Sequence, residues 1–195
     1  MRAAGASGAA RLKGIDFSRD SPLVARRLIG MRLLIGGVGG IIVETEAYDA
    51  KDPASHSFSG PTPRNAVMFG PPGRAYVYLS YGIHWCLNFV CREAGHGAGV
   101  LIRALEPTTG IALMIDRRRQ EDLRILCAGP GRLGQALGLT HELNGARIGK
   151  PPFSLRPANT RPRIVCGPRI GLSKAVERRW RFGLADSRYL SHPFR

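Results

Sequence analysis

Hydrophobic and polar positions alternate in short runs through the middle of the chain, whereas helical spacing occurs toward its two ends. The spacing predicts a helix over residues 22–29, with Ser21 as its N-cap, Pro22 in its first turn and Gly30 as its stop. The glycine-rich residues 36–40 predict a hairpin turn between a strand over residues 31–35 and a strand over residues 40–45. Runs rich in β-branched and aromatic residues predict strands over residues 31–35, 40–45, 75–81, 84–91, 99–104, 163–166 and 180–184.

Two further helices are predicted in the second half of the chain. Thr108 and Thr109 are suited to cap a helix that ends near Arg118. The Gly-Pro-Gly sequence at residues 129–131 introduces a short helix over residues 132–137. Both helices lie outside the central group of strands, so we expect them at the periphery of a sheet.

The remaining stretches give the limits of the predicted domain and its two longest loops. Residues 49–73 and 139–163 contain many turn formers and little periodicity, and connections of such length are usually functional or disordered. Residues 1–14, rich in Ala, Gly, Ser and Arg, predict a flexible tail, and residues 15–195 a single domain. Because strands gather between helices, we predict an α+β fold with a curved, mainly antiparallel sheet, an open barrel or roll with peripheral helices.

The charge of the chain indicates its class of partner. Lysine and arginine number 29 against 14 acidic residues, and the formal net charge is +15 over 195 residues. Such a field attracts polyanions, and nucleic acid is the default partner because its phosphates release counterions on binding. A solvated arginine-rich surface is the alternative, and composition does not decide between the two. Hydrophobic residues make up 44% of the chain, so a packed core is expected.

The cysteines and the apolar runs indicate the compartment. Cys86, Cys91, Cys127 and Cys166 form no CxxC pair and have no histidine partner at zinc spacing, so we expect free thiols and no metal. No phosphate-loop or dinucleotide pattern occurs, so no cofactor is expected. Without a membrane-length apolar run or a signal peptide, we expect an intracellular protein: in the cytoplasm or nucleoid if bacterial, in the nucleus if eukaryotic.

The segment over residues 41–48 carries the most chemical information, because an apolar strand ends there on a carboxylate and an aromatic ring, Glu46 and Tyr48. Strand alternation places Glu44 and Glu46 on one face. Carboxylates are seldom buried without a partner, and Arg103, a cation in an apolar strand, is the obvious candidate. The acid and the arginine could form a structural ion pair, or they could hold a water molecule between them.

Aromatic and polar residues on the neighbouring strands could complete a pocket. Tyr76 and Tyr78 share one face of their strand, and we expect Tyr76 to pack in the core. Tyr81 follows at a turn with Gly82, where we expect an exposed ring. Asn88 lies in an apolar strand and must be hydrogen-bonded or face a cavity.

The loop after residue 48 adds a histidine and a polar turn. His56 follows a Pro-Ala-Ser turn, and a lone loop histidine is more often incidental than catalytic. The turn Thr62-Pro63-Arg64-Asn65 offers backbone donors and an arginine, which suits phosphate contact, although many surface turns are similar. An acid, a histidine and several tyrosines in a basic protein suggest a pocket for a flat, electron-poor group taken from a polyanion.

Taken in order, these segments resemble the alkyladenine (3-methyladenine, methylpurine) DNA glycosylase family from about Phe17 to Tyr189. The motifs that carry the resemblance are Val43-Glu44-Thr45-Glu46-Ala47-Tyr48, His56-Ser57-Phe58, Thr62-Pro63-Arg64-Asn65, Met68-Phe69, Tyr76-Val77-Tyr78-Leu79-Ser80-Tyr81-Gly82, Cys86-Leu87-Asn88, Val100-Leu101-Ile102-Arg103-Ala104-Leu105-Glu106-Pro107, Gly129-Pro130 with Leu133, Gln135-Ala136-Leu137 and Pro168-Arg169-Ile170-Gly171. The resemblance implies a monomeric base excision repair enzyme, without metal or cofactor, that acts on double-stranded DNA. It would flip an alkylated or deaminated purine, of the 3-methyladenine, 7-methylguanine or hypoxanthine type, out of the duplex and hydrolyse its N-glycosidic bond, leaving an abasic site.

The resemblance also implies a role for individual residues. Glu46 matches the catalytic acid that activates the attacking water, Arg103 helps to hold that water, and the backbone carbonyl of Ile170 is its third anchor. Tyr81 matches the ring inserted into the duplex. The residues expected to line the base pocket are Tyr48, His56, Tyr78, Asn88, which crowds the exocyclic amine of guanine, and Leu101. The residues expected near the DNA backbone are Thr62, Arg64, Asn65 and Gly171.

Two other functions agree with parts of the sequence. A basic RNA- or DNA-binding module without catalysis could stack unpaired bases on its aromatic strand, and it would prefer single strands. A hydrolase of nucleosides or another small substrate would leave the charge of +15 unexplained. No lysine lies in the matched motifs, so a Schiff-base route that also cuts the strand is disfavoured and the predicted enzyme is monofunctional.

Overall fold

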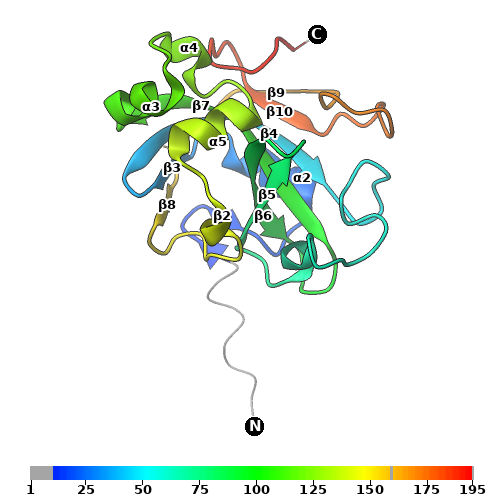
Figure 1. Cartoon of the computed structure of the whole chain (residues 1–195). Coiled ribbons are helices and arrows are strands. Elements are labelled where there is room, and N and C mark those ends of the chain that lie inside the picture. The colour runs from blue at the N-terminus through cyan, green and yellow to red at the C-terminus, as the bar shows by residue number, and fades with distance from the viewer. Residues whose placement is uncertain (1–10, 159, 195) are drawn as a thin grey trace.

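A curled antiparallel sheet forms the centre of the molecule (Figure 1). The computed structural model describes residues 11–158 and 160–194. The strands of this sheet are β3 (Arg32–Ile35), β4 (Val38–Tyr48), β5 (Ala75–Ser80), β6 (His84–Cys91), β7 (Ala98–Thr109), β8 (Phe153–Arg156), β9 (Ile164–Gly167) and β10 (Arg181–Leu184). Their order is β5-β6-β7-β4-β10-β9, and β3 pairs with both β4 and β8. Every pairing is antiparallel.

The helices cover the sheet and its edges. In the described part of the chain they are α2 (Ser21–Leu28), α3 (Ile111–Arg118), α4 (Leu123–Leu126) and α5 (Pro130–Leu137), with the 3-10 helices η1 (Ala66–Phe69) and η2 (His141–Leu143). Helices α3, α4 and α5 gather on one side of the molecule, near β7 (Figure 1). The predicted α+β class, with a curved antiparallel sheet and peripheral helices, is confirmed.

The core between α2 and the sheet determines which way the glutamates of β4 point. Val24, Ala25 and Leu28 are buried on one stripe of α2, at the spacing of an amphipathic helix. Thr45 of β4 faces this helix, and its hydroxyl donates to the carbonyl of Ala25 at 3.0 Å. Because successive strand residues point to opposite faces, the two glutamates that flank Thr45 point away from α2.

Strands β4 and β7 are longer than the sequence pattern predicts. They continue to Tyr48 and Thr109, past the ends predicted at residues 45 and 104. Pro107 does not stop β7, because it pairs with Gly40 beside a shift in register, where a missing N–H donor is tolerated. Strand β4 thus ends on Tyr48, as the apolar segment over residues 41–48 indicated.

The predicted caps of two helices are wrong. Thr108 and Thr109 lie in β7, and the N-cap of α3 is Gly110, in the left-handed conformation with φ of 72°. At α2 the N-cap is Asp20, and Ser21 is the first helical residue. Neither helix has a side-chain capping hydrogen bond, so these hydroxyl residues were misleading signals.

Some stretches predicted to be irregular contain regular structure. Residues 139–163 include η2 and β8, and β8 extends the sheet beside β3. Residues 49–73 form turns and η1, as predicted. Of the predicted tail, residues 1–10 lie outside the described residues, whereas Arg11–Leu12 (β1) pair with Ile15–Asp16 (β2) in a small hairpin.

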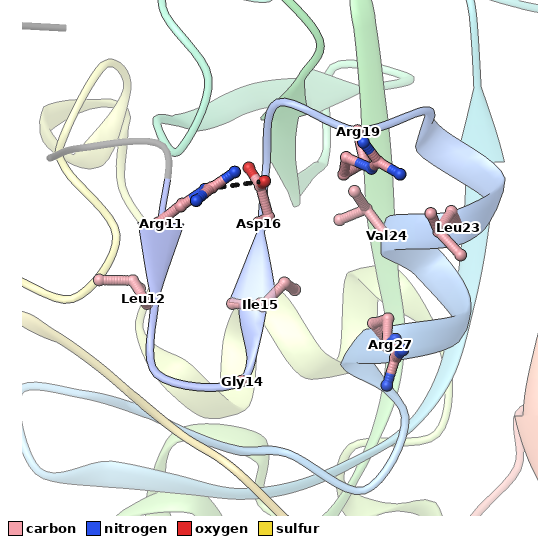
Figure 2. Close-up of a pocket in the computed structure, with 9 residues that line it drawn as sticks. All are labelled: Arg11, Leu12, Gly14, Ile15, Asp16, Arg19, Leu23, Val24 and Arg27. Carbon is pink, nitrogen blue, oxygen red and sulfur yellow. Dashed lines mark hydrogen bonds and ion pairs between the residues drawn. The ribbon is translucent and has the colours of Figure 1, made fainter. Parts of the chain in front are cut away.

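This hairpin and α2 enclose a cleft of about 440 Å³, shown in Figure 2. Arg11 and Asp16 pair across the hairpin at 3.0 Å, and Arg19 and Arg27 extend along the same cleft. The cleft shares no lining residue with the cavity beside Arg103 described below. It adds basic charge on the α2 side of the sheet, away from the glutamates of β4.

Candidate active site

An irregularity in the β4–β7 pairing directs Arg103 toward the two glutamates of β4. The register shifts between Glu44 and Thr45, and Arg103 has no register partner in β4. A bulge of this kind re-aims a side chain and is common beside active sites. The guanidinium of Arg103 donates from Nε to Glu44 and from Nη1 to Glu46, both at 3.2 Å. The predicted pairing of an acid on β4 with Arg103 is therefore present.

The buried charges of this cluster balance one another. Glu44 and Glu46 are completely buried, and Arg103 and Arg181 are 7% and 4% exposed. Arg181 pairs with Glu44 at 2.7 Å. Burial alone would lower the pKa of Arg103, but the nearby Glu46 and Glu44 outweigh it, and the pKa is raised. Two carboxylates thus meet two guanidiniums, which avoids the large cost of an unpaired buried charge.

Donors from three segments hold the Glu46 carboxylate. Oε2 accepts hydrogen bonds from the Tyr48 hydroxyl at 2.9 Å and from Arg103. Oε1 accepts from the backbone N–H of Ile170 at 2.8 Å. The sequence predicted a contribution from the Ile170 carbonyl, and the contact that this structure contains is made by the N–H of the same residue. An ionised carboxylate offers about four acceptor positions, so one position remains for a further donor.

Tyr48 is fixed from two sides. Its hydroxyl is bound to Glu46, and the Arg169 guanidinium lies 4.7 Å from the centre of its ring. Arg169 in turn pairs with the buried carboxylate of Asp52 and donates to the carbonyl of Ala47 at 2.9 Å. Burial, reinforced by the charge of Glu46, raises the pKa of Tyr48, so its hydroxyl stays protonated and donates to the carboxylate.

A cavity of about 620 Å³ borders this cluster. All five residues predicted for the base pocket line it: Tyr48, His56, Tyr78, Asn88 and Leu101. Arg103 and Ile170 line it as well. Glu46 does not reach the surface itself but lies directly behind three of the lining residues, with each of which it forms a hydrogen bond.

A row of paired residues across four strands explains how the cavity is assembled. Leu101 of β7 pairs with Glu46 of β4 on one side and with Asn88 of β6 on the other, and Asn88 pairs with Tyr76 of β5. Directly paired residues lie on the same face of a sheet, so this row carries the acid and the polar amide on one surface. The Asn88 side chain donates to the carbonyl of Tyr76 at 3.3 Å, which fixes its orientation.

One wall of the cavity is aromatic. Tyr78 stacks on Tyr76 with ring centres 5.3 Å apart, and His56 meets Tyr78 edge-on at 4.6 Å. Tyr76 packs in the core, as predicted, although its ring also borders the cavity. Burial, reinforced by the charge of Arg64, lowers the pKa of His56, so the imidazole is neutral at pH 7. The neutral ring can offer one donor and one acceptor to a ligand.

The loop over residues 62–65 is held by hydrogen bonds of the Asn65 side chain. Asn65 is buried, and its side chain accepts from the Thr62 N–H at 2.6 Å and donates to the carbonyls of His56 and Gly60. Its side chain therefore stabilises the loop that carries His56 and is not free to contact DNA. Arg64 is exposed, lines the cavity and donates to the Leu79 carbonyl at 2.7 Å.

The turn between β5 and β6 bears the most exposed aromatic ring among the described residues that line the cavity. Tyr81 is 89% exposed and adopts φ of 51°, in the left-handed region that bulky residues rarely occupy. Ile83 follows with 71% exposure. Gly171, on the segment after β9, also lines the cavity and adopts φ of 72°. A protruding ring thus stands at the rim of the cavity, as predicted for Tyr81.

Across residues 11–158 and 160–194, no group of three or more His, Cys, Asp or Glu side chains could hold a metal ion. Cys86, Cys91 and Cys127 are buried free thiols, as predicted, and Cys166 is a partly buried one. In the same part of the chain, no helix has both the length and the apolar character needed to cross a bilayer.

Sequence reasoning missed several residues of the site. Arg169 and Asp52 were not identified, although Arg169 lies in a matched motif next to Ile170. Cys86 pairs with Tyr78 in the β5–β6 register and also lines the cavity, so the strand pairing would have revealed it. The other lining residues not predicted are Ala54, Ser55, Met68, Tyr76, Ser80, Gly82, Pro130 and Leu172.

Comparison with known proteins agrees with this geometry. The family model described as methylpurine-DNA glycosylase matches residues 15–188. A protein of Nitrosospira multiformis is 65% identical over 93% of this chain and 94% of its own length. Proteins of Rhodopseudomonas palustris (strain BisB18) and Rhizobium meliloti are 60% and 54% identical, over 94% and 91% of this chain and 92% and 95% of their own lengths. Each bears the name "Putative 3-methyladenine DNA glycosylase".

The match covers the buried cluster of Glu44, Glu46 and Arg103, the aromatic wall and the exposed tyrosine, since all of these lie between residues 15 and 188. The family model matches most of the chain, and each of these relatives is more than 50% identical in sequence, which shows common ancestry. The chain belongs to the methylpurine-DNA glycosylase family, and it is a DNA repair hydrolase of the DNA glycosylase class.

Proposed function

We propose that this enzyme removes 3-methyladenine, 7-methylguanine and hypoxanthine from double-stranded DNA by hydrolysing the N-glycosidic bond and leaving an abasic site. The observation that carries the proposal is the buried Glu46–Arg103 pair at the edge of a ring-lined cavity of about 620 Å³. Chemistry on a base requires the nucleotide to leave the stack and enter such a pocket.

Glu46 supplies the base that activates water. Its carboxylate keeps one acceptor position after binding Tyr48, Arg103 and Ile170, and a water held there is oriented for attack on the sugar carbon. The same anion stabilises the positive charge that develops on the sugar as the bond breaks. General-base help of this kind contributes about 10²–10⁴-fold to a rate.

The aromatic residues select the base. A purine alkylated at N3 or N7 is cationic, and stacking against Tyr48 and Tyr78 gains cation–π attraction of about 1–2 kcal/mol when water is excluded. Arg169 already covers part of the Tyr48 ring, but Asp52 neutralises it, so a cationic base meets little net repulsion. Asn88 lies in the same cavity and crowds the exocyclic amine at C2, which guanine carries and adenine lacks.

Tyr81 and the residues at the rim of the cavity contact the DNA duplex. Inserting the exposed Tyr81 ring would fill the gap that the flipped nucleotide leaves and slow its return. Arg64 and Thr62 are exposed beside the cavity, and the Gly171 backbone lies open at its rim, so these three are the residues we assign to the phosphates. We do not assign Asn65 to DNA, because its side chain is committed to the loop.

The enzyme leaves the DNA strand intact and acts as a monomer. The described residues that line the cavity include no lysine, which a Schiff-base lyase would require. The substrate is genomic DNA, so we expect the enzyme to act in the cytoplasm or nucleoid of a bacterial cell.

An abasic-site assay tests this proposal. Duplexes with a single hypoxanthine, 7-methylguanine or 3-methyladenine analogue are incubated with the enzyme, and abasic sites are revealed by strand cleavage in alkali. We expect cleavage only after alkali, only at the lesion, and faster in duplexes than in single strands. Preference for single strands without any base release would favour a nucleic-acid-binding module instead. Breaks formed without alkali would contradict the monofunctional reaction.

A further inference from the structure

We propose that the segment Ser191–Phe194 positions the catalytic arginine, acting through Glu44. This inference rests on the role proposed above for Arg103. Ser191 lies 88 positions after Arg103 in the sequence, and its hydroxyl is 3.4 Å from Arg103 Nη2. Glu44 and Ser191 touch neither the cavity nor, by our proposal, the substrate, so both are positioning residues.

Glu44 is the hub of this arrangement. Its Oε1 accepts hydrogen bonds from Arg103 Nε at 3.2 Å, Arg181 Nε at 2.7 Å and the Ser191 hydroxyl at 2.8 Å. Its Oε2 accepts from the backbone N–H of Ser191 at 2.6 Å. All four donors converge on a carboxylate that is completely buried. The carboxylate can therefore adopt one orientation, and that orientation determines where Arg103 Nε lies.

The carboxylate of Glu44 is needed to fix the orientation of the Arg103 guanidinium. A guanidinium is a planar fork, so fixing Nε on Glu44 fixes the direction in which Nη1 points, which is toward Glu46. With Glu46 alone, the long side chain of Arg103 could rotate while keeping one hydrogen bond. A displacement of about 1 Å at a reacting group can cost about 10²-fold in rate.

The Ser191–Phe194 segment is anchored by contacts of its own. Arg181 donates to the carbonyls of His192 and Pro193, and its guanidinium lies 3.9 Å from the centre of the Phe194 ring. The ring packs on the backbone of two adjacent strands where both have glycine, at Gly167 and Gly183. A Cβ at Gly183 would overlap the ring. The two strands thus provide the surface on which Phe194 packs, and this packing places Ser191 against Glu44.

Substitutions at Ser191 and at Ser187, a serine that precedes the segment, separate the positioning role from general stability. Ser191→Ala removes the hydroxyl that binds Glu44 and Arg103. Ser187→Ala is the matched control, because that hydroxyl accepts from the N–H of Tyr189 and forms no hydrogen bond with Glu44 or Arg103. Ser191→Thr keeps the hydroxyl and serves as the conservative variant. A chain ending at Leu190 removes all contacts of the segment at once.

Single-turnover base release and lesion binding are measured separately for each variant with a hypoxanthine duplex. We expect Ser191→Ala to lower the rate constant of release about tenfold, the equivalent of one hydrogen bond to a charged group. The shortened chain should lose about 10²-fold. Ser191→Thr and Ser187→Ala should match the wild type, and the Kd for the duplex should not change in any of them.

Equal losses of affinity and rate, or wild-type release by Ser191→Ala and by the shortened chain, would overturn the proposal. A second readout does not depend on activity: the Nε–H resonance of Arg103 in a ¹⁵N NMR spectrum. We expect it to be sharp and protected from exchange in the wild type and Ser187→Ala, and broadened in Ser191→Ala. If the wild-type enzyme released no base, the proposed function would fail, and this resonance would still decide whether Ser191 orders Arg103.

Discussion

Removing one partner of the buried ion pair between Asp52 and Arg169 should destabilise this fold far more than removing one partner of an exposed pair. The two side chains are 0% and 1% exposed, and both guanidinium Nη atoms bind the carboxylate. Replacing Asp52 by Asn keeps the shape of the side chain but leaves Arg169 buried without a counter-charge. Breaking a buried pair in this way costs about 3–5 kcal/mol of unfolding free energy.

The matched control is the exposed pair of Arg163 and Asp186, whose side chains are 76% and 79% exposed. Solvent screens such a pair, so Asp186→Asn should change the free energy of unfolding by at most about 1 kcal/mol. For a chain of this size, each kcal/mol shifts Tm by about 2–4 °C. We therefore expect Tm to fall by roughly 6–20 °C in Asp52→Asn and by less than about 4 °C in the control.

The free energies of unfolding and Tm are measured by urea titration and thermal scans for the wild type, Asp52→Asn, Asp186→Asn, Arg169→Met and the double variant Asp52→Asn/Arg169→Met. The double variant Asp52→Asn/Arg169→Met should recover part of the lost stability, because it removes both charges and leaves neither unpaired. Equal stability losses in Asp52→Asn and Asp186→Asn would refute the reasoning. A double variant that loses more unfolding free energy than its two single variants lose together would also refute it, since the two residues would then not act as a pair.

Three further predictions concern the cavity and the fold around it. Tyr81→Ser should weaken binding of a lesion duplex in an anisotropy titration and leave Tm unchanged, because the ring is 89% exposed; unchanged affinity would contradict insertion. His56 should titrate below the usual pKa of 6.5 by NMR, because burial and then Arg64 lower its pKa, and Arg64→Ala should raise it. Since the folded-state pKa is the lower one, stability should decline as pH falls through it. Gly134→Ala should lower Tm, because its Cβ would overlap the Trp85 carbonyl; a wild-type Tm would contradict that close packing.

Local sequence patterns were sufficient for the strands that carry the chemistry. Alternation placed Glu44 and Glu46 on one face of β4, and a cation in an apolar strand pointed to Arg103 as their partner. The strand boundaries were less predictable, because Pro107 is tolerated only where the register shifts, and a register shift is a property of two strands together.

The supporting residues could not be predicted for a related reason. Nothing in the sequence around Ser191 or Asp52 indicates a partner, since Ser191 binds Glu44 across 147 positions of the chain and Asp52 binds Arg169 across 117. Asn65 shows the opposite case: its polar turn suggested DNA contact, but the structure satisfies its amide inside the loop. Local composition indicates that a polar group needs a partner, and only the tertiary structure determines which one.

The most direct test of the account is single-turnover base release by Glu46→Gln on a duplex with one hypoxanthine. The amide keeps the size of the side chain, and Arg103 keeps its pairing with Glu44, so the fold and the lesion affinity should persist. Release should fall by about 10²–10⁴-fold, while Glu106→Gln, the same change on β7 outside the cavity, should match the wild type. Release by Glu46→Gln at the wild-type rate would contradict the assignment of that carboxylate as the base.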